Sequence, residues 1–294
     1  MTVSNDDLSL DFRPVADDSR IGFILMRAGR LNREDIPRII HSQRQNGLRF
    51  GDAAIQLGLL EAQDVQSALA RQFSYAYVKH GDSEISKEVV AAYEPSSQSA
   101  ESIRALRSHL MMRWFNSGDP SRSAVAITGP ERKVGRSWLA ANLAVAFSQL
   151  GKSTVLLDGD LRDPRQHQLF GIENRTGMAQ LLCNSARLKE VLHRNLVLPN
   201  LAVLPAGAIP PNPQEIIARG GFERLLSELR CTAEVILVDT PADSQGCDGR
   251  IIAKHVGAAV VISRQHRSSA TQLANYFADL ADSAVAVVLT VVTQ

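Results

Sequence analysis

Three short segments of the chain hold side chains that suit the binding of nucleotide phosphates and a divalent cation. The first is GPERKVGRS at 129–137, which ends in Ser137 directly before an amphipathic segment. Two others, TVLLDGD and VILVDT, place Asp158, Asp160 and Asp239 at the ends of apolar runs. A hydroxyl and carboxylates of this kind hold magnesium or its waters beside nucleotide phosphates. We therefore predict ATP and Mg²⁺ as cofactors. The predicted metal ligands are Ser137, Asp158 and Asp239, and the predicted catalytic carboxylates are Asp158 and Asp160.

The first of these segments follows the phosphate-binding pattern GxxxxGK[ST] only in part. Gly135, Arg136 and Ser137 stand at its last three positions, and Pro130 stands where its first glycine belongs. A lysine ammonium is a compact charge that fits between phosphate oxygens, whereas a guanidinium is wide and planar. We predict that Arg136 is the catalytic cation of a loop that binds nucleotide but transfers phosphoryl groups poorly. The predicted nucleotide contacts are Gly135, Arg136, Ser137 and Trp138.

A second pattern with chemical potential is a duplication in the N-terminal quarter. Residues 20–43 and 49–72 repeat one another at an offset of 29, across a spacer of five residues. An array of such repeats needs about three copies to bury its faces, so two copies indicate a small closed helical domain. Four residues recur identically, and four apolar positions recur in kind: Arg20, Gly22, Gly29 and Gln43 as Arg49, Gly51, Gly58 and Gln72, and Ile21, Leu25, Ile36 and Ile40 as Phe50, Ala54, Val65 and Leu69.

Each repeated position has a use in a ligand site. An arginine fork pairs with guanine O6 and N7 or with a phosphate, and glycines let backbone N–H groups approach phosphate oxygens. Alternatively, the glycines end helices, the apolar residues form a core and the arginines lie on a solvated face. We favour the ligand site because the pattern occurs twice in register. Its predicted residues are Arg20, Ile21, Gly22, Leu25, Gly29, Gln43, Arg49, Phe50, Gly51, Gly58 and Gln72.

Two kinds of structure must position these residues. From residue 124 on, β-branched runs alternate with amphipathic segments, which predicts crossover helices and a doubly wound, mostly parallel sheet. Ligands of such sheets bind at the carboxyl ends of the strands, where the three segments end. The polar stretch EPSSQSAES indicates a linker that leads into a helix. The predicted α/β protein has a flexible N-terminus at 1–17, a helical tandem-motif domain at 18–78, a linker and helix at 79–120, and a phosphate-binding α/β domain at 121–294.

Composition narrows the class of protein. A formal net charge of +1 argues against nucleic acid as a partner. No apolar run reaches the roughly 18 to 20 residues that span a bilayer, and residues 1–18 are polar, so we predict a cytoplasmic location. Cys183, Cys231 and Cys247 form neither a metal-binding pattern nor an even disulfide set, and we predict that they are structural.

The α/β half, from about residue 88 on, resembles the bacterial tyrosine kinases of polysaccharide export, which are relatives of the MinD and ParA ATPases. The likeness is most specific in LLDGDLRDP and in LPAGAIPPNPQEII at 204–217. Lys133 and Val134 depart from it, because the kinases usually have glycine and an acidic residue there. The resemblance also implies that Glu101, Arg104 and Arg107, in ExxRxxR spacing, contact a neighbouring subunit of a homo-oligomer. The alternative is an ordinary solvated helix face.

The duplicated half resembles the MshEN domain of type IV pilus and type II secretion ATPases, which binds cyclic di-GMP. Both halves together look like the EpsG type of chain-length-determinant tyrosine kinase in exosortase-linked exopolysaccharide loci. This resemblance implies cyclic di-GMP as effector and an integral-membrane chain-length regulator as partner, with peripheral docking at the inner membrane. A pilus or secretion ATPase is disfavoured, because the α/β half of the chain carries the polysaccharide-kinase segments instead.

Two functions of different class remain open at this stage. One is an ATP-dependent kinase or ATPase gated by cyclic di-GMP. The other is a non-catalytic cyclic di-GMP receptor that docks on a membrane polysaccharide-export complex. The family's usual acceptor is a tyrosine cluster on a C-terminal tail, but the tyrosines here are Tyr75, Tyr77, Tyr93 and Tyr276. Arg136 and the missing cluster favour the receptor, whereas Ser137 and the aspartates favour the enzyme.

Overall fold

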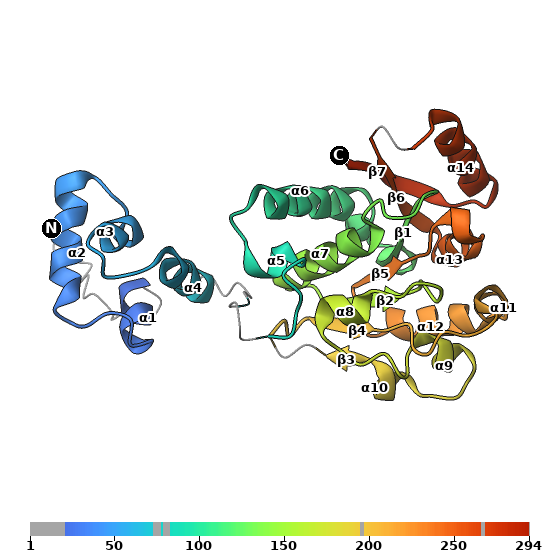
Figure 1. Ribbon diagram of the computed structural model, residues 1–294, viewed down its shortest axis with the longest axis horizontal. Coiled ribbons are helices and arrows are strands. Elements are labelled where there is room, and N and C mark those ends of the chain that lie inside the picture. The colour runs from blue at the N-terminus through green and yellow to red at the C-terminus, as the bar shows by residue number, and fades with distance from the viewer. Residues whose placement is uncertain (1–20, 73–77, 79–82, 195–196, 266–267, 294) are drawn as a thin grey trace, which may run out of the picture. The chain divides into compact units, whose positions relative to one another are not determined.

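The computed structural model describes residues 21–72, 78, 83–194, 197–265 and 268–293. The chain divides into two compact units, Met1–Tyr75 and Ala76–Gln294 (Figure 1). Within the described residues, no helix is long and apolar enough to cross a membrane.

The first unit interlocks its two repeats. Its helices are α1 (Ile21–Arg27), α2 (Asp35–Asn46), α3 (Phe50–Gln56) and α4 (Ala62–Gln72). Helix α1 of the first repeat packs on α4 of the second, and α2 packs on α3. A helix pair cannot bury its own apolar face alone, so each repeat completes the core of the other. The buried core residues are Leu25, Leu31, Ile39, Ala53, Ala54, Leu60 and Ala68.

The two repeats turn between their helices in the same way. Gly29 and Gly58 end α1 and α3 in the left-handed region, with φ of 67° and 68°. The next residue closes each turn, because the N–H of Arg30 donates to the Leu25 carbonyl and that of Leu59 to the Ala54 carbonyl, both at 3.0 Å. This is the usual glycine-ended helix terminus, where a side chain would be strained.

The second unit is built on one seven-stranded sheet in the order β3-β4-β2-β5-β1-β6-β7. All neighbouring strands run parallel except the short β3, which pairs antiparallel with β4. The mostly parallel sheet expected from the sequence is therefore confirmed. The strands are β1 (Ala124–Thr128), β2 (Thr154–Asp158), β3 (His193–Arg194), β4 (Leu201–Leu204), β5 (Val235–Asp239), β6 (Ala258–Arg264) and β7 (Ala286–Thr293).

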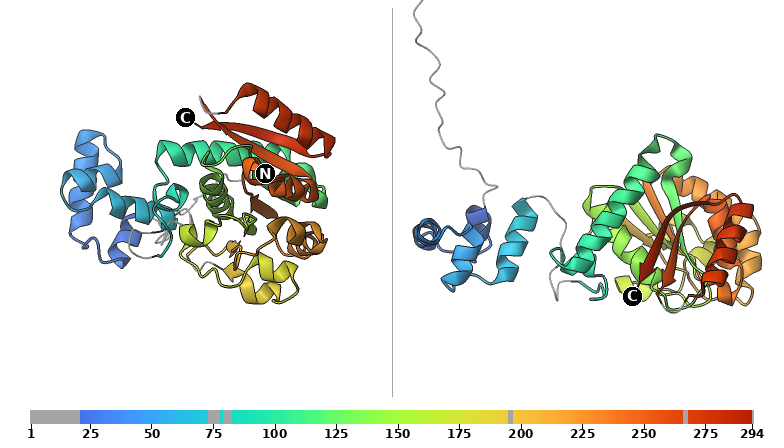
Figure 2. Two further views of the ribbon diagram at one scale, coloured as in Figure 1. Left: turned by 45° about the vertical axis from the view of Figure 1, so that its right-hand side comes forward. Right: turned by 90° about the horizontal axis from the view of Figure 1, so that it is seen from above.

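Helices cover both faces of this sheet (Figures 1 and 2). The side chains of β1 alternate between the two faces of the sheet. Val125 and Ile127 enter one core, and Ala124 and Ala126 enter the other. One face carries α5 (Val90–Tyr93), α6 (Gln98–Arg113), α7 (Arg136–Gln149) and α8 (Gln166–Phe170). The other carries α9 (Met178–Leu182), α10 (Leu188–Val191), α11 (Pro213–Ala218), α12 (Gly221–Arg230), α13 (Asp248–Val256) and α14 (Ala270–Asp282). Short 3₁₀ turns are η1 (Phe115–Ser117), η2 (Pro120–Ser123) and η3 (Asp243–Gln245).

The segment that precedes α6 is bound to the α/β unit. Asn142 on α7 accepts a hydrogen bond from the N–H of Ala91 at 2.9 Å and donates to the Glu88 carbonyl at 3.2 Å. Ile85, Val89 and Tyr93 are buried in the same core as α7. A stretch whose polar composition predicts a linker therefore includes residues that pack against the sheet's covering helices.

Candidate functional site

The three chemically suggestive segments meet at the carboxyl edge of the sheet. The order of strands places β5 between β2 and β1, so Asp158 and Asp239 stand directly opposite each other. The loop that follows β1 begins at Gly129, where an added Cβ would lie 2.3 Å from the Ile262 carbonyl oxygen on β6. Only glycine fits there, and the loop then leads into α7 at Arg136. Sheet pairing brings together residues that the chain separates widely.

The loop of residues 129–137 has a left-handed backbone conformation, which glycine favours, at a position that is occupied by lysine. Gly135 has φ of 98° and Lys133 has φ of 59°, both in the left-handed region. A residue with a Cβ pays about 1–2 kcal/mol for that conformation. Successive backbone N–H groups in such turns form anion-binding concavities. The loop therefore carries backbone strain at the place where phosphate would be bound, as functional loops often do.

Arg136 does not occupy the position predicted for a catalytic cation. Its side chain folds back into the protein and is 8% exposed. The guanidinium donates through Nε to the Thr240 carbonyl at 2.9 Å and through Nη1 to the Glu131 carbonyl. Burial lowers the pKa of Arg136, and Asp239 and Asp160 oppose that effect. Because a planar fork reaches two carbonyls at once, Arg136 ties the loop to the end of β5, which local sequence does not indicate.

Asp158 and Asp239 are both fully buried, and burial raises the pKa of each. For Asp158 burial is the main cause, followed by repulsion from Asp239, and its pKa lies well above the ordinary value. Its oxygens accept hydrogen bonds from the N–H groups of Asp160, Arg165 and Gln166 at 3.3, 3.0 and 2.8 Å. Burial raises the pKa of Asp239 to about 6 although side-chain hydrogen bonds from Gln166 and Ser137 lower it. Burial removes water from both carboxylates, and each repels the other's negative charge. The charged form of both groups is therefore disfavoured when no cation lies beside them.

Gln166 joins these groups and is a site residue that sequence reasoning missed. It is fully buried at the start of α8, and its Nε2 donates to Asp239 Oδ2 at 2.8 Å and to the Ser137 carbonyl at 3.1 Å. Gln166 Oε1 and Asp239 Oδ1 are buried atoms without a hydrogen-bond partner among the described residues. Gln166 follows the aspartate-rich segment LLDGDLRDP, and no motif in the sequence marks it as a site residue.

These orphaned oxygens fit a magnesium ion or its waters. Magnesium takes oxygen ligands, and it is commonly held by one or two carboxylates together with substrate phosphates. In the described part of the chain, no group of three or more His, Cys, Asp and Glu side chains could hold a metal by itself. The predicted ligands Ser137, Asp158 and Asp239 are nevertheless brought together by the fold, with Gln166 among them. A cation here would depend on nucleotide oxygens for the rest of its coordination.

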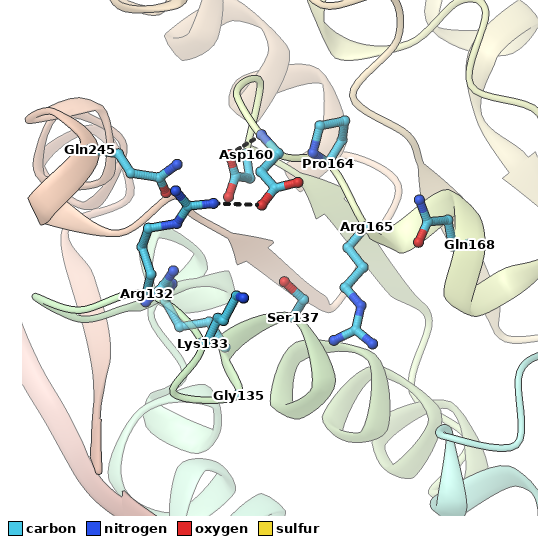
Figure 3. Close-up of a pocket in the computed structure, with 11 residues that line it drawn as sticks. Arg132, Lys133, Gly135, Ser137, Asp160, Pro164, Arg165, Gln168 and Gln245 are labelled. Atoms are coloured by element: carbon cyan, nitrogen blue, oxygen red, sulfur yellow. Dashed lines mark hydrogen bonds and ion pairs between the residues drawn. The ribbon is translucent and has the colours of Figure 1, made fainter. Parts of the chain in front are cut away.

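A cavity of about 370 Å³ opens beside this cluster (Figure 3). Asp160, which is 5% exposed, lies in its wall and accepts hydrogen bonds from the N–H groups of Arg162 and Asp163 at 3.1 and 2.9 Å. Trp138 does not line the cavity; its side chain is half-buried and packs against the core that includes α7. The lining residues are Arg132, Lys133, Gly135, Arg136, Ser137, Asp160, Asp163, Pro164, Arg165, Gln168 and Gln245.

The ExxRxxR residues on α6 divide into two roles. Arg104 donates through Nε to Glu101 Oε2 at 3.0 Å, so the half-buried Arg104 side chain pairs with the exposed Glu101 side chain. Arg107 instead turns inward, and its Nη1 donates to the Ala146 carbonyl of α7 at 3.1 Å. Residues three apart on a helix share a face only approximately, and packing decides which of them reaches a neighbouring element. The structure thus assigns Arg107 a contact within its own unit.

In the N-terminal unit, the repeated glycines have structural uses. A Cβ on Gly51 would lie 2.4 Å from Val65 Cγ1, and one on Gly22 would lie 3.4 Å from Ile36 Cδ1. These are equivalent helix contacts in the two repeats. Gly29 and Gly58 form the left-handed turns already described, and Leu25 and Ala54 are buried core residues.

The other predicted ligand contacts of this unit remain at or near its surface. Arg49 is exposed, whereas Ile21, Phe50, Gln43 and Gln72 are half-buried. Arg20 lies outside the described residues. Two further identities share the 29-residue offset and were missed. Leu31 and Leu60 are buried, and Asp35 and Asp64 accept hydrogen bonds from the N–H groups of Asn32 and Glu61 at 2.8 and 3.1 Å.

The tyrosines that the structure describes are inside the α/β unit. Tyr93 donates its hydroxyl hydrogen bond to the Ile85 carbonyl at 2.5 Å. The Tyr276 hydroxyl lies 2.5 Å from Thr128 Oγ1, and burial raises the pKa of Tyr276 to about 12. Tyr75 and Tyr77 lie outside the described residues. Neither described tyrosine presents its hydroxyl to solvent as a phosphoryl acceptor.

Comparison with known proteins adds sequence and fold relatives. No family profile matches the chain. It is 31% identical over 196 residues to the tyrosine-protein kinase YwqD of Bacillus subtilis, which covers 67% of this chain and 81% of YwqD. It is 27% identical over 177 residues to the tyrosine-protein kinase Wzc of Salmonella typhi, which covers 60% of this chain but 24% of Wzc. The crystal structure of the chimeric protein CapA2B2 is similar with a TM-score of 0.65 at 25% identity, over 78% of this chain and 98% of that one.

Proposed function

The chain belongs to the family of bacterial tyrosine-protein kinases, and from this premise we propose that it binds Mg-ATP at the loop of residues 129–137. We further propose that it regulates the chain length or export of an exopolysaccharide. One observation carries the nucleotide proposal. The buried Asp239 and Gln166 meet the half-buried Ser137 beside a strained phosphate-type loop, and one oxygen each of Asp239 and Gln166 lacks a partner among the described residues.

Each residue of the cluster has a distinct part in this proposal. The Ser137 hydroxyl and Asp239 Oδ1 would hold the ion, which when bound supplies charge neutralisation between the nucleotide phosphates. Asp158 holds the N–H groups of Arg165 and Gln166, and so it positions the segment that carries Gln166. Gln166 Nε2 orients Asp239 so that its other oxygen is available to the ion. Asp160 lies in the cavity wall, where it can contact the ion's waters.

The test is calorimetric titration of the full chain with Mg-ATP. The change is Asp239→Asn, and the matched control is Asp282→Asn at an exposed position at the end of α14. We expect at least a tenfold loss of Mg-ATP affinity for Asp239→Asn and none for the control, because only the first removes a charged ligand. Unchanged binding in Asp239→Asn would remove this site from consideration.

A second candidate function is a nucleotide-binding regulator without turnover. Two observations favour it. The Arg136 guanidinium is held by two carbonyls rather than directed into the cavity, and the described tyrosines are buried. Transfer requires a charge placed at the moving phosphoryl group, and misplacement lowers the rate more than the affinity. Single-turnover release of phosphate from Mg-ATP, with and without a tyrosine-containing acceptor peptide, separates the two functions.

We propose cyclic di-GMP as the effector bound by the duplicated unit. Support comes from the in-register repeat and from Arg49, which remains exposed beside the half-buried Phe50. The glycines do not add support, because helix packing and turns account for them. The test is titration with cyclic di-GMP using Arg49→Ala and Arg20→Ala, with the exposed Arg27→Ala as control. Binding that is equal in all four proteins, or absent in the unmodified chain, would contradict the proposal.

We also propose that the protein docks peripherally on an integral-membrane chain-length regulator and forms homo-oligomers. In this proposal the contact is made around the exposed Glu101 and its ion-pair partner Arg104, whereas Arg107 donates to a carbonyl within its own unit. Light scattering of the unmodified chain and of Arg104→Ala, each with and without cyclic di-GMP, tests this. A mass that neither change affects would sink the oligomer proposal.

A further inference from the structure

Four cationic side chains surround the cavity beside the loop: Arg132, Lys133, Arg136 and Arg165. Three of them are already engaged. Arg132 Nη2 lies 3.1 Å from Asp163 Oδ2, and Arg165 Nη2 lies 2.6 Å from Glu88 Oε2. Arg136 is held by the Thr240 and Glu131 carbonyls.

Lys133 differs from the other three cations. Among the described residues it has no hydrogen bond and no ion pair, and its side chain is exposed. Figure 3 shows this side chain directed into the cavity, on the side where Ser137 lies. The Lys133 ammonium thus lies at the rim of the cavity, near the cluster of Ser137, Asp239 and Gln166. Among the described residues, it makes no contact there that would stabilise the fold.

The backbone of Lys133 gives a second, independent indication. Its φ of 59° is a conformation that glycine adopts without strain. A lysine at such a position is retained against a local conformational preference, and such strain clusters at ligand-binding sites. Among the described residues, Asn184 and Ala284 share this conformation, and of the three only Lys133 lines the cavity.

We propose that Lys133, rather than Arg136, is the cation that contacts the nucleotide phosphates in this loop. The inference rests on the proposed function, since it names the phosphate-binding residue of the same site. A lysine carries three donors on a flexible stem and behaves as a compact point charge. It can therefore enter the cavity from the middle of the loop and reach phosphate oxygens beside Ser137. Arg136, two residues before Trp138 on α7, keeps the loop closed against β5 instead.

The exchange of roles predicts a specific pattern of nucleotide affinities. Lys133→Gly removes the charge and leaves a residue suited to the left-handed backbone, so folding is not at risk. We expect it to weaken Mg-ATP binding by about ten- to a hundredfold, the usual worth of a charged hydrogen bond to phosphate. Lys133→Gln, which keeps much of the side-chain length without charge, should show the same loss. Arg132→Gln, which removes an already paired cation, should change affinity by less than about threefold.

A combined variant tests whether the two positions have exchanged roles. Lys133→Gly together with Arg136→Lys recreates the usual loop arrangement, and we expect it to recover at least tenfold of the affinity lost in Lys133→Gly. Arg136→Lys alone should not improve on the unmodified chain, because Lys133 already supplies the charge. Titrations at two salt concentrations should show a weaker salt dependence for Lys133→Gly.

The outcomes distinguish this inference from the proposed function. If the unmodified chain binds no Mg-ATP, the proposed function fails and the inference fails with it. If the unmodified chain binds Mg-ATP and Lys133→Gly binds equally well, only the assignment of Lys133 is overturned. Loss of binding in Arg136→Met without loss in Lys133→Gly would return the role to Arg136.

Discussion

The helical unit and the loop of residues 129–137 fill left-handed backbone positions with different residues. In the helical unit, Gly29 and Gly58 hold such positions, and each ends a helix. In the α/β unit most such positions are also glycines, but Lys133 holds one in a loop beside a cluster of buried carboxylates. The helical unit follows the local preferences of its residues, whereas the loop departs from them. Departures of this kind are expected at functional sites, where binding chemistry outweighs local stability.

A second contrast between the units concerns charge. Among the described residues of the helical unit, Ser42 is the one buried polar side chain, and no carboxylate is buried. Asp35 and Asp64 lie near the starts of helices, where they accept backbone hydrogen bonds. The α/β unit instead buries Asp158 and Asp239 opposite each other. Burial of carboxylates that lack a cation lowers the free energy of unfolding, so Asp158 and Asp239 destabilise the α/β unit at the carboxyl edge of its sheet.

The largest effect is expected for Asp239→Asn in metal-free buffer. The pKa of Asp239 is raised to about 6, so the folded state binds a proton more tightly than the unfolded state. That stabilisation is complete below the unfolded pKa of 3.8 and is lost as pH rises through about 6. Asn does not titrate, so it carries no penalty for a buried charge at high pH. We expect the free energy of unfolding of the variant to exceed that of the unmodified chain by up to about 3 kcal/mol at pH 7.5 and by much less at pH 4.5. Urea unfolding followed by tryptophan fluorescence measures this, since Trp114 and Trp138 both belong to the α/β unit. A gain that is the same at both pH values would argue against a titrating carboxylate.

A somewhat smaller effect is expected for Gly51→Ala. The added Cβ would meet Val65 Cγ1 at 2.4 Å, and a β-branched side chain has little freedom to move away. We expect a loss of about 1–3 kcal/mol from overpacking, measured by hydrogen exchange of the amides in α1–α4. The double variant Gly51→Ala with Val65→Ala should lose less than the sum of the two single changes. Additive losses would show that the two residues do not press on each other.

Matched losses are expected for Gly29→Ala and Gly58→Ala. Neither added Cβ meets an atom within 4 Å, so only the left-handed backbone is strained. We expect about 1 kcal/mol for each, and nearly the same value for both because their turns are equivalent. The same amide-exchange measurement applies. A large difference between the two would break the symmetry of the repeats.

The smallest effect is expected for the stability of Lys133→Gly. Relief of the left-handed strain is partly offset by the greater backbone entropy of glycine in the unfolded chain. We expect a gain of up to about 1 kcal/mol by urea unfolding, opposite in sign to the glycine substitutions of the helical unit. A clear loss of stability would mean that the Lys133 side chain makes a structural contact.

Much of the fold follows from local pattern. The runs at Ala124–Thr128, Thr154–Asp158 and Val235–Asp239 are strands as predicted, because both faces of a central parallel strand are buried and most of its residues are therefore apolar. The edge strand β3 was missed, since two residues carry no periodic signal. The 29-residue offset likewise appears in the structure as equivalent turns and equivalent helix contacts.

By itself, the sequence determined which residues have the chemistry of a phosphate and magnesium site and which backbone positions are duplicated. These properties depend on residue type and on spacing along the chain. The tertiary structure alone decided that Asp239 lies opposite Asp158, that Gln166 joins Asp239 to the Ser137 carbonyl, and that Arg136 turns away into the β5 end. Those outcomes depend on strand order and on contacts between segments far apart in the chain, where competition for carbonyls and carboxylates is settled only once the sheet is assembled. The different parts of Arg136 and Lys133 thus follow from which partners the fold brings within reach.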